Sequence, residues 1–183
     1  ELVVERSGVL NLGVEGMMAM GAVAGFGGAF LTQNPWVGIP CAILAGMAMS
    51  LLFAFLTLTL LANQVATGLA LTLLGLGLSA LLGEGFVGQL GVKLPVAYGI
   101  DPLIIFSFLL TAFVAWLLFR SKAGLIIRAV GNSHASAHAL GYPVILVRYL
   151  CVMFGGACAG LGGGYLSLVY TPQWVENMTA GRG

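Results

Sequence analysis

The stretch Arg120–Arg148, RSKAGLIIRAVGNSHASAHALGYPVILVR, is the longest polar segment of this chain, and it decides how the rest is read. It holds four of the 7 Lys and Arg residues and both histidines, but no acidic residue. On either side lie about twenty apolar residues, enough for a helix to cross the roughly 30 Å hydrocarbon core of a bilayer. A basic loop between two membrane spans faces the cytoplasm. The sequence therefore predicts an all-α, polytopic transmembrane helix bundle with a cytoplasmic segment at 120–148.

Composition supports a membrane protein. Of the 183 residues, 60% are hydrophobic and 7% are charged, whereas charged residues make up about a quarter of a soluble domain. The start of the chain, with Glu1 and Glu5, is acidic and lacks the basic character of a secretory signal. We expect residues 1–183 to form a single transmembrane domain that is an internal fragment, truncated at both ends.

Five spans are predicted, at 13–31, 37–62, 65–83, 100–119 and 149–170. With the basic loop inside, alternation places the Arg6 end and the Asn63-Gln64 turn inside, and Pro35 and the connection 84–99 outside. The first span is the least regular, because it is rich in glycine and contains Glu15. It is open at this point whether that span crosses as one helix or is broken or re-entrant.

Glycine is the second compositional signal, with 28 residues in the chain. Gly156, Gly160 and Gly164 recur every four residues along the fifth span, and Gly21 and Gly25 do the same in the first. Such stripes of small residues let helix backbones approach closely in lipid. We predict that they serve helix packing within the bundle rather than a dedicated dimer motif.

Motifs of known catalytic chemistry are absent from the sequence. It has no GxxxxGK[ST] phosphate loop, no HExxH and no GxSxG, and we therefore predict a chain that is not an enzyme. His134 and His138 would share a helix face, but no carboxylate or thiol accompanies them in the loop, so we favour solvated positions over a metal site. Cys41, Cys151 and Cys158 lie in apolar spans, where cysteine acts as a small hydrophobic residue. No metal site is predicted.

The basic loop carries the signals of a short helix. Asn132 or Ser133 can cap its start, HASAHAL supplies alanine-rich helix, Gly141 suits a left-handed C-terminal cap, and Pro143 prevents continuation. A helix of about two turns is therefore predicted. Its smooth face suits either docking in a groove of a partner or a plain connection. Anionic membrane lipid is an equally good partner for the cations Arg120, Lys122 and Arg128.

A few polar residues lie at or near apolar runs. Glu15 is an intramembrane acid and so a functional candidate. With Asn11 as an N-cap, however, Glu15 would lie in the first turn and interact with the positive end of the helix, and we favour this capping role. Asn63, Gln64 and Thr67 are candidates for the polar lining of a solute pathway, although turn residues at a membrane interface look the same.

Four segments together resemble the permease subunits of bacterial ATP-binding-cassette (ABC) importers, in the branch that includes nucleoside, simple-sugar and branched-chain amino acid permeases. These segments are ERSGVLNLGVEGMMAMGA (5–22), NQVATGLALTLLGLGLS (63–79), GLIIRAVGNSHASAHALGYPV (124–144) and GGACAGLGGGYLSLVYTPQWVENMTAGRG (155–183). The resemblance covers almost the whole chain. NLGVEG and WVENMTAGRG are most similar to the nucleoside or simple-sugar branch.

The resemblance implies a subunit of the bacterial inner membrane that pairs with a second permease subunit, an ABC ATPase and an extracytoplasmic solute-binding protein. ATP and Mg²⁺ would be bound by the ATPase, and this chain would need no cofactor and bind no nucleic acid. The resemblance assigns ATPase coupling to Arg128, Gly131, Asn132, Ser133, Ser136, Ala137 and Gly141. Family members commonly follow RAVG with an acidic residue, Asn-Pro and paired alanines, whereas this chain has Asn132-Ser133-His134 and then Ser136-Ala137.

The leading hypothesis is a permease subunit that moves a small polar solute, such as a nucleoside or a simple sugar, with ATP hydrolysed elsewhere. A second hypothesis is an ion-coupled secondary transporter whose broken helix near Gly13–Glu15 binds substrate and ion. A third is a membrane scaffold that transports nothing and recruits a partner through its basic loop. The solute itself cannot be read from these residues, because scattered Asn, Gln and Thr accept many polar ligands.

Overall fold

The computed structural model describes residues 1–91, 94–95 and 101–183, and within these the regular secondary structure is entirely helical. Five helices are long and apolar enough to cross a membrane. They are α2 (Val14–Thr32), α3 (Pro35–Ala54) with its π-helical end η1 (Phe55–Thr59), α4 (Gln64–Gly83) with the 3-10 turn η2 (Glu84–Phe86), α5 (Pro102–Arg120), and α8 (Val144–Tyr165) with its π-helical end η3 (Leu166–Tyr170). The shorter helices are α1 (Leu2–Arg6), α6 (Lys122–Asn132) and α7 (His134–Ala139). The predicted all-α polytopic bundle is confirmed.

Two span boundaries differ from those expected. The second span ends at Thr59 rather than at residue 62, because Leu61 adopts a left-handed backbone with φ 55°. The fifth span begins at Val144, five residues before the expected start, so Arg148 lies inside a helix and not in a loop. Residue 100, where the fourth span was expected to begin, lies outside the described residues, and α5 starts at Pro102.

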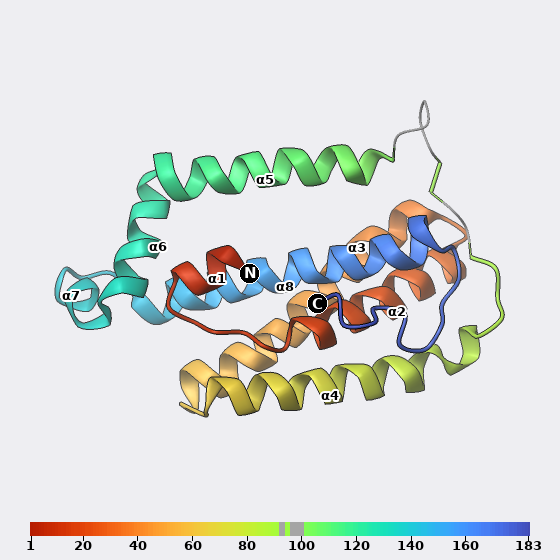
Figure 1. Ribbon diagram of the computed structural model, residues 1–183, viewed down its shortest axis with the longest axis horizontal. Coiled ribbons are helices and arrows are strands. Elements are labelled where there is room, and N and C mark those ends of the chain that lie inside the picture. Colours follow the sequence, from red (N-terminus) through yellow and green to blue (C-terminus); the bar gives the residue numbers. More distant parts are fainter. Residues whose placement is uncertain (92–93, 96–100) are drawn as a thin grey trace.

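Successive long helices run in opposite directions along the long axis of the molecule (Figure 1). α6, α7 and the turn between α3 and α4 lie at one end, called here the basic end; the α2–α3 turn and η2 lie at the other. This is the alternation that the sequence predicts. That the basic end faces the cytoplasm stays a prediction.

The core is a three-helix unit in which α2, α3 and α8 pack on one another, and α4 packs on α2. Glycines make these contacts possible. Gly160 of α8 lies against Gly21 of α2 on one side and Ala42 and Gly46 of α3 on the other, so close that a Cβ on Gly160 would overlap the Ala42 carbonyl oxygen. Gly156 lies against Ser50 of α3 in the same way. Gly164 of the same stripe faces the Ala42 side chain, 2.7 Å from where its Cβ would stand.

Helix α5 is attached to the rest of the bundle mainly through α6 (Figure 1). Leu118, near its end, is buried against Val3 and Cys151, while most of its other residues are exposed. A groove of about 250 Å³ lies between α5 and the faces of α3 and α8, lined by apolar side chains that include Phe106, Leu110 and Phe154. The loosely attached helix contrasts with the tightly packed core.

The first span is not preceded directly by another helix, because residues 7–13 form an irregular connection between α1 and α2. α2 begins near the middle of the long axis and continues to the end opposite the basic end (Figure 1). The last segment, 171–183, turns back from that end and finishes near the start of α2 (Figure 1). Two irregular segments thus meet inside a bundle that is otherwise helical.

Adjacent glycines of α8 provide a matched test of the core. We expect Gly163→Ala to lower the free energy of unfolding by about 1–3 kcal/mol, as overpacking of a filled core does, because its Cβ would overlap the Met18 carbonyl oxygen. Gly162→Ala should leave stability unchanged or raise it, since its Cβ would meet only the Met18 methyl group at 3.8 Å and alanine favours helix. Thermal unfolding of both variants in detergent distinguishes them. Equal effects at the two positions would contradict this packing.

Candidate functional site

Two short helices make up the basic end and join α5 to α8. Ser121 caps α6 by accepting a hydrogen bond from the Gly124 backbone N–H at 3.0 Å. α6 lies across the end of the bundle (Figure 1) and buries Val130 while Lys122 remains exposed. The sequence analysis missed this helix. The serine cap and the apolar pair Ile126 and Val130, four residues apart, were the signals that could have revealed it.

Helix α7 lies where the sequence predicts it, and its ends are capped. The Ser133 side chain accepts from the Ser136 N–H at 3.3 Å and lies 2.8 Å from the Ser136 hydroxyl. At the other end Gly141 has φ 83°, its N–H donates to His138 O at 3.0 Å, and the Tyr142 N–H donates to Ala137 O at 3.2 Å. These bonds satisfy groups that a helix end leaves open, so a helix of six residues is well defined.

The residues expected to couple to an ATPase fall into two groups. Three of them have structural roles. Ala137 is fully buried against Val130 and Val144. Gly141 adopts the left-handed conformation, and Gly131 has no room for a Cβ beside the Arg6 carbonyl oxygen. Three others lie at the junction of α6 and α7. Asn132 is the exposed last residue of α6, and Ser133 and Ser136 form the cap.

Arg128 differs from the other residues of the set. Its guanidinium carbon lies 5.8 Å from the centre of the Phe119 ring, a distance at which a cation is attracted to an aromatic face. Its Nε is buried and has no hydrogen-bond partner among the described residues. Arg128 therefore joins the end of α5 to α6.

A junction that the sequence analysis did not foresee ties the basic end to the N-terminal segment. Arg148 of α8 donates from Nε to the backbone oxygen of Ser7 at 3.1 Å. Ser7 is fully buried and donates its hydroxyl to Val4 O at 2.6 Å. Gly8, with φ 81°, lies against both Gly131 and Arg148. α6 and α8 therefore both contact the connection that leads into α2.

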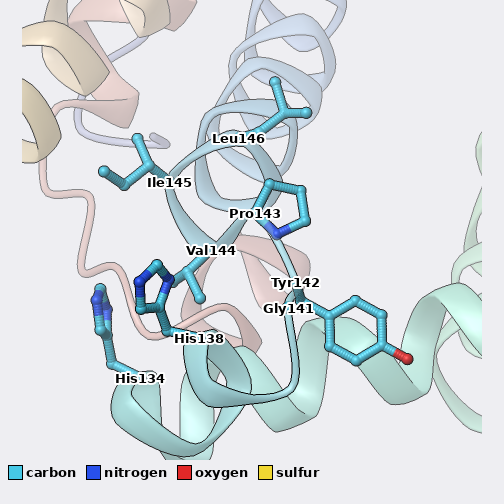
Figure 2. A pocket seen from close by; sticks show the side chains of 8 residues that line it. All are labelled: His134, His138, Gly141, Tyr142, Pro143, Val144, Ile145 and Leu146. Carbon is cyan, nitrogen blue, oxygen red and sulfur yellow. The ribbon is translucent and has the colours of Figure 1, made fainter.

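An open pocket of about 680 Å³ lies beside α7. We call it the imidazole pocket; it is lined by His134, His138, Gly141, Tyr142, Pro143, Val144, Ile145 and Leu146. Figure 2 shows the two imidazoles side by side on α7, near Ile145, with the Tyr142 phenol pointing away from them. Both histidines are exposed. Within the described residues, no group of three or more His, Cys, Asp or Glu side chains is placed to hold a metal ion.

The second polar site is the meeting point of α2 and the C-terminal segment. Glu15 lies in the first turn of α2, and its carboxylate accepts hydrogen bonds from the Thr179 hydroxyl and from the backbone N–H groups of Gly181, at 3.0 Å, and Gly183. Thr179 is 1% exposed. The sequence analysis expected Asn11 to be the N-cap of α2, but the N-cap is Gly13. Asn11 instead binds the capping residue, because its Oδ1 accepts a hydrogen bond from the Gly13 N–H at 2.9 Å.

The three candidates for a polar lining on α4 do not join Glu15 in one site. Asn63 caps α4 by accepting from the N–H groups of Val65 and Ala66, at 3.0 and 3.1 Å. The Gln64 Oε1 accepts from the Leu10 N–H at 2.8 Å, and Thr67 is half-buried nearby. Asn63 and Gln64 therefore have structural hydrogen bonds at the basic end, whereas Glu15 binds the C-terminal segment.

These features define the class of protein: a multi-pass membrane protein with a tightly packed helical core and a structured basic segment at one end. The chain belongs to the family described as branched-chain amino acid transport system, permease component, whose model matches residues 1–183. Members of this family are transport components rather than enzymes. No solved structure matches the chain.

Relatives of the chain are named as ABC transporter permease proteins. The chain is 43% identical over 202 residues to the "Putative glucose ABC transporter permease protein TsgC13" of Haloferax volcanii, covering 100% of this chain and 61% of that protein. It is 31% identical over 206 residues to the guanosine ABC transporter permease protein NupQ of Bacillus subtilis, covering 98% and 65%. A nucleoside ABC transporter permease protein of Lactococcus lactis, NupC, is 28% identical over 205 residues, covering 98% and 65%. The chain thus spans less than two thirds of the length of these relatives.

Removing the charge of Glu15 tests the second site. In Glu15→Gln, the donors of the C-terminal segment lose a charged acceptor. A hydrogen bond to a charged group typically contributes about 1.5–3 kcal/mol to stability. We therefore expect backbone amides of residues 177–182 to exchange with deuterium about tenfold faster or more, a factor that corresponds to about 1.4 kcal/mol. Hydrogen-exchange mass spectrometry measures this.

Glu176→Gln is the matched control, because Glu176 lies in the same segment and is exposed. It should leave the exchange rates as they are. Unchanged exchange in Glu15→Gln would show that the carboxylate does not hold this segment.

Proposed function

We propose that the chain is the greater part of a permease subunit of an ABC importer, which moves a nucleoside or a simple sugar across the plasma membrane. The proposal is supported by the family to which the chain belongs and by relatives named for glucose, guanosine and nucleoside transport. ATP and Mg²⁺ would be bound by a separate ATPase subunit. A second permease subunit and an extracytoplasmic solute-binding protein complete the proposed assembly.

The observation that carries the proposal is the rigid helix α7 and its mechanical connection to the bundle. Its caps and the buried Ala137 fix α7 against α6 and α8. From there, Gly131 contacts the Arg6 backbone, and Arg148 bonds to Ser7. A push on α7 from a closing ATPase would reach both α8 and the connection into α2, and rigid helices in contact transmit such displacements.

Glu15, Asn63, Gln64 and Thr67 would line the solute pathway at separate points, in addition to the structural hydrogen bonds that Asn63, Gln64 and Glu15 make. Solute would enter from the end opposite α7, where the binding protein would dock, and leave at the basic end. Anionic membrane lipid would contact the cations around α6, Arg120 and Lys122 among them.

One observation favours a second candidate, an ion-coupled transporter. Glu15 is an acid inside the bundle, close to an irregular segment at the start of α2, and such breaks bind ions in secondary transporters. If that mechanism operates, an uncoupler abolishes uptake while ATP is held constant. The variant Glu15→Gln abolishes uptake as well. ATP-driven uptake that survives the uncoupler excludes it. The absence of any solute flux in reconstituted vesicles would indicate a scaffold instead.

Replacing Ser133–Leu140 in the full-length permease by a Gly-Ser linker of equal length tests the proposed role of α7. We expect the variant to insert into the membrane but to lose both co-purification with the ATPase and solute uptake. The reason is that a flexible linker cannot present a fixed surface or transmit a push. Pull-down on the tagged permease and uptake in vesicles measure the two effects.

Ser133→Ala provides a graded comparison. Loss of the N-cap weakens a helix by about 1 kcal/mol, so this variant should reduce ATPase binding without abolishing it. Normal ATPase co-purification by the linker variant would refute docking at α7.

A further inference from the structure

We infer that the imidazole pocket receives an aspartate or glutamate side chain of the ATPase subunit, held by His134 and His138. The inference rests on the proposed function and adds the chemistry of the contact. It concerns His134 and His138, which line the pocket and are not among the residues expected from the sequence to couple to an ATPase.

The pocket has the shape and lining for such a side chain. Its opening is wide, and its polar groups are the two imidazoles, which stand side by side on α7 (Figure 2). Ile145 and Leu146 are both more than half exposed and form an apolar wall. Imidazole N–H groups donate hydrogen bonds and a carboxylate accepts them, while the aliphatic wall suits the methylene groups that carry the carboxylate.

The histidines are held in place before any partner arrives. They are four residues apart and so share one face of α7. Ala137, between them, is fully buried against Val130 and Val144, which prevents α7 from rotating. The caps at Ser133 and Gly141 fix both ends of the helix. A site that is already ordered loses little conformational freedom on binding.

The pocket lining contains no acidic side chain, and the charged residues of the two helices packed against α7 are all basic. The chain has no Asp or Glu between Asp101 and Glu176. The helices packed against α7 are α6 and α8, which contribute Lys122, Arg128 and Arg148. Complementary charge across an interface speeds association and excludes partners of like charge. An acidic side chain therefore fits this surface, whereas a Lys or Arg does not.

The position of the pocket favours a protein over a lipid phosphate. α7 lies at the extreme tip of the molecule, beyond the ends of the long helices (Figure 1). The two histidines stand on α7, outside the apolar spans, while Ile145 and Leu146 of the pocket wall belong to the first turn of α8. A soluble subunit that docks from the aqueous side reaches the tip first.

Charge variants of the full-length permease test the inference by the affinity of the purified ATPase subunit. We expect the pair His134→Glu and His138→Glu to raise the Kd at least tenfold, through repulsion of the partner's acid. The pair His134→Gln and His138→Gln, which keeps donors of similar size, should raise it by a smaller factor. The matched control is Ala123→Glu, which adds an acid to an exposed position of α6 outside the pocket and should change nothing.

The measurements are made in nanodiscs of neutral phosphatidylcholine and again with anionic lipid. Weaker binding of the His→Glu pair in both lipids supports the inference. Wild-type affinity of that pair overturns it, and so does a loss confined to anionic discs, which would assign the pocket to lipid headgroups. Failure of the wild-type permease to bind the ATPase would instead refute the proposed function and the inference with it.

Direct contact is tested with a carbodiimide, which joins an amine to a carboxylate only when the two touch. His138→Lys places an amine in the pocket, and Ala123→Lys places one outside it. We expect a peptide cross-linked between Lys at 138 and an Asp or Glu of the ATPase, identified by mass spectrometry, and none from position 123. Cross-linking at 123 but not at 138 would contradict the inference.

Discussion

Contact between helix backbones in the α2, α3 and α8 core is the constraint on which the rest of the structure depends. In a bilayer, apolar side chains gain nothing by leaving lipid for protein, so helices associate by close packing instead. Gly21, Gly46 and Gly160 bring three backbones together at one place, where no side chain would fit. This unit holds α8 firmly, and α8 in turn carries Arg148, the imidazole pocket and the segment that reaches Glu15.

Much of this architecture could be predicted from the sequence, because its signals are local. Runs of apolar residues define spans, and Ser133 and Gly141 mark the ends of α7 by their own conformational preferences. Helix α6 was missed, since it is amphipathic rather than apolar and its serine cap directly follows a span. The hydrogen bond from Arg148 to Ser7 could not be predicted, because it joins residues 141 positions apart and depends on how α1 and α8 pack. The same holds for Glu15, whose position in a first turn was predicted but whose partners were not.

Two polar junctions in the bundle each anchor an irregular segment. Arg148 holds the Ser7 end of the connection into α2, and Glu15 holds the segment after α8. Buried backbone groups outside regular helices need such partners, because lipid supplies none. The start of α2 lies between the two junctions, so its position depends on both. By contrast, α5 has mainly α6 as its support, and among the described residues no side-chain hydrogen bond joins it to the core.

The long separation between Ser7 and Arg148 has a consequence for biosynthesis. A ribosome adds about 5–20 residues per second, so the partner of Ser7, 141 positions later, is made roughly 7 to 28 s after Ser7 itself. Glu15 waits longer still, since Thr179 lies 164 positions further along the chain. During this interval the Glu15 carboxylate and several backbone groups near the first span lack their final hydrogen-bond partners, and lipid offers no substitute for them. We expect the nascent protein to keep this region at the bilayer surface or inside the insertion machinery until α8 and residues 171–183 have been made.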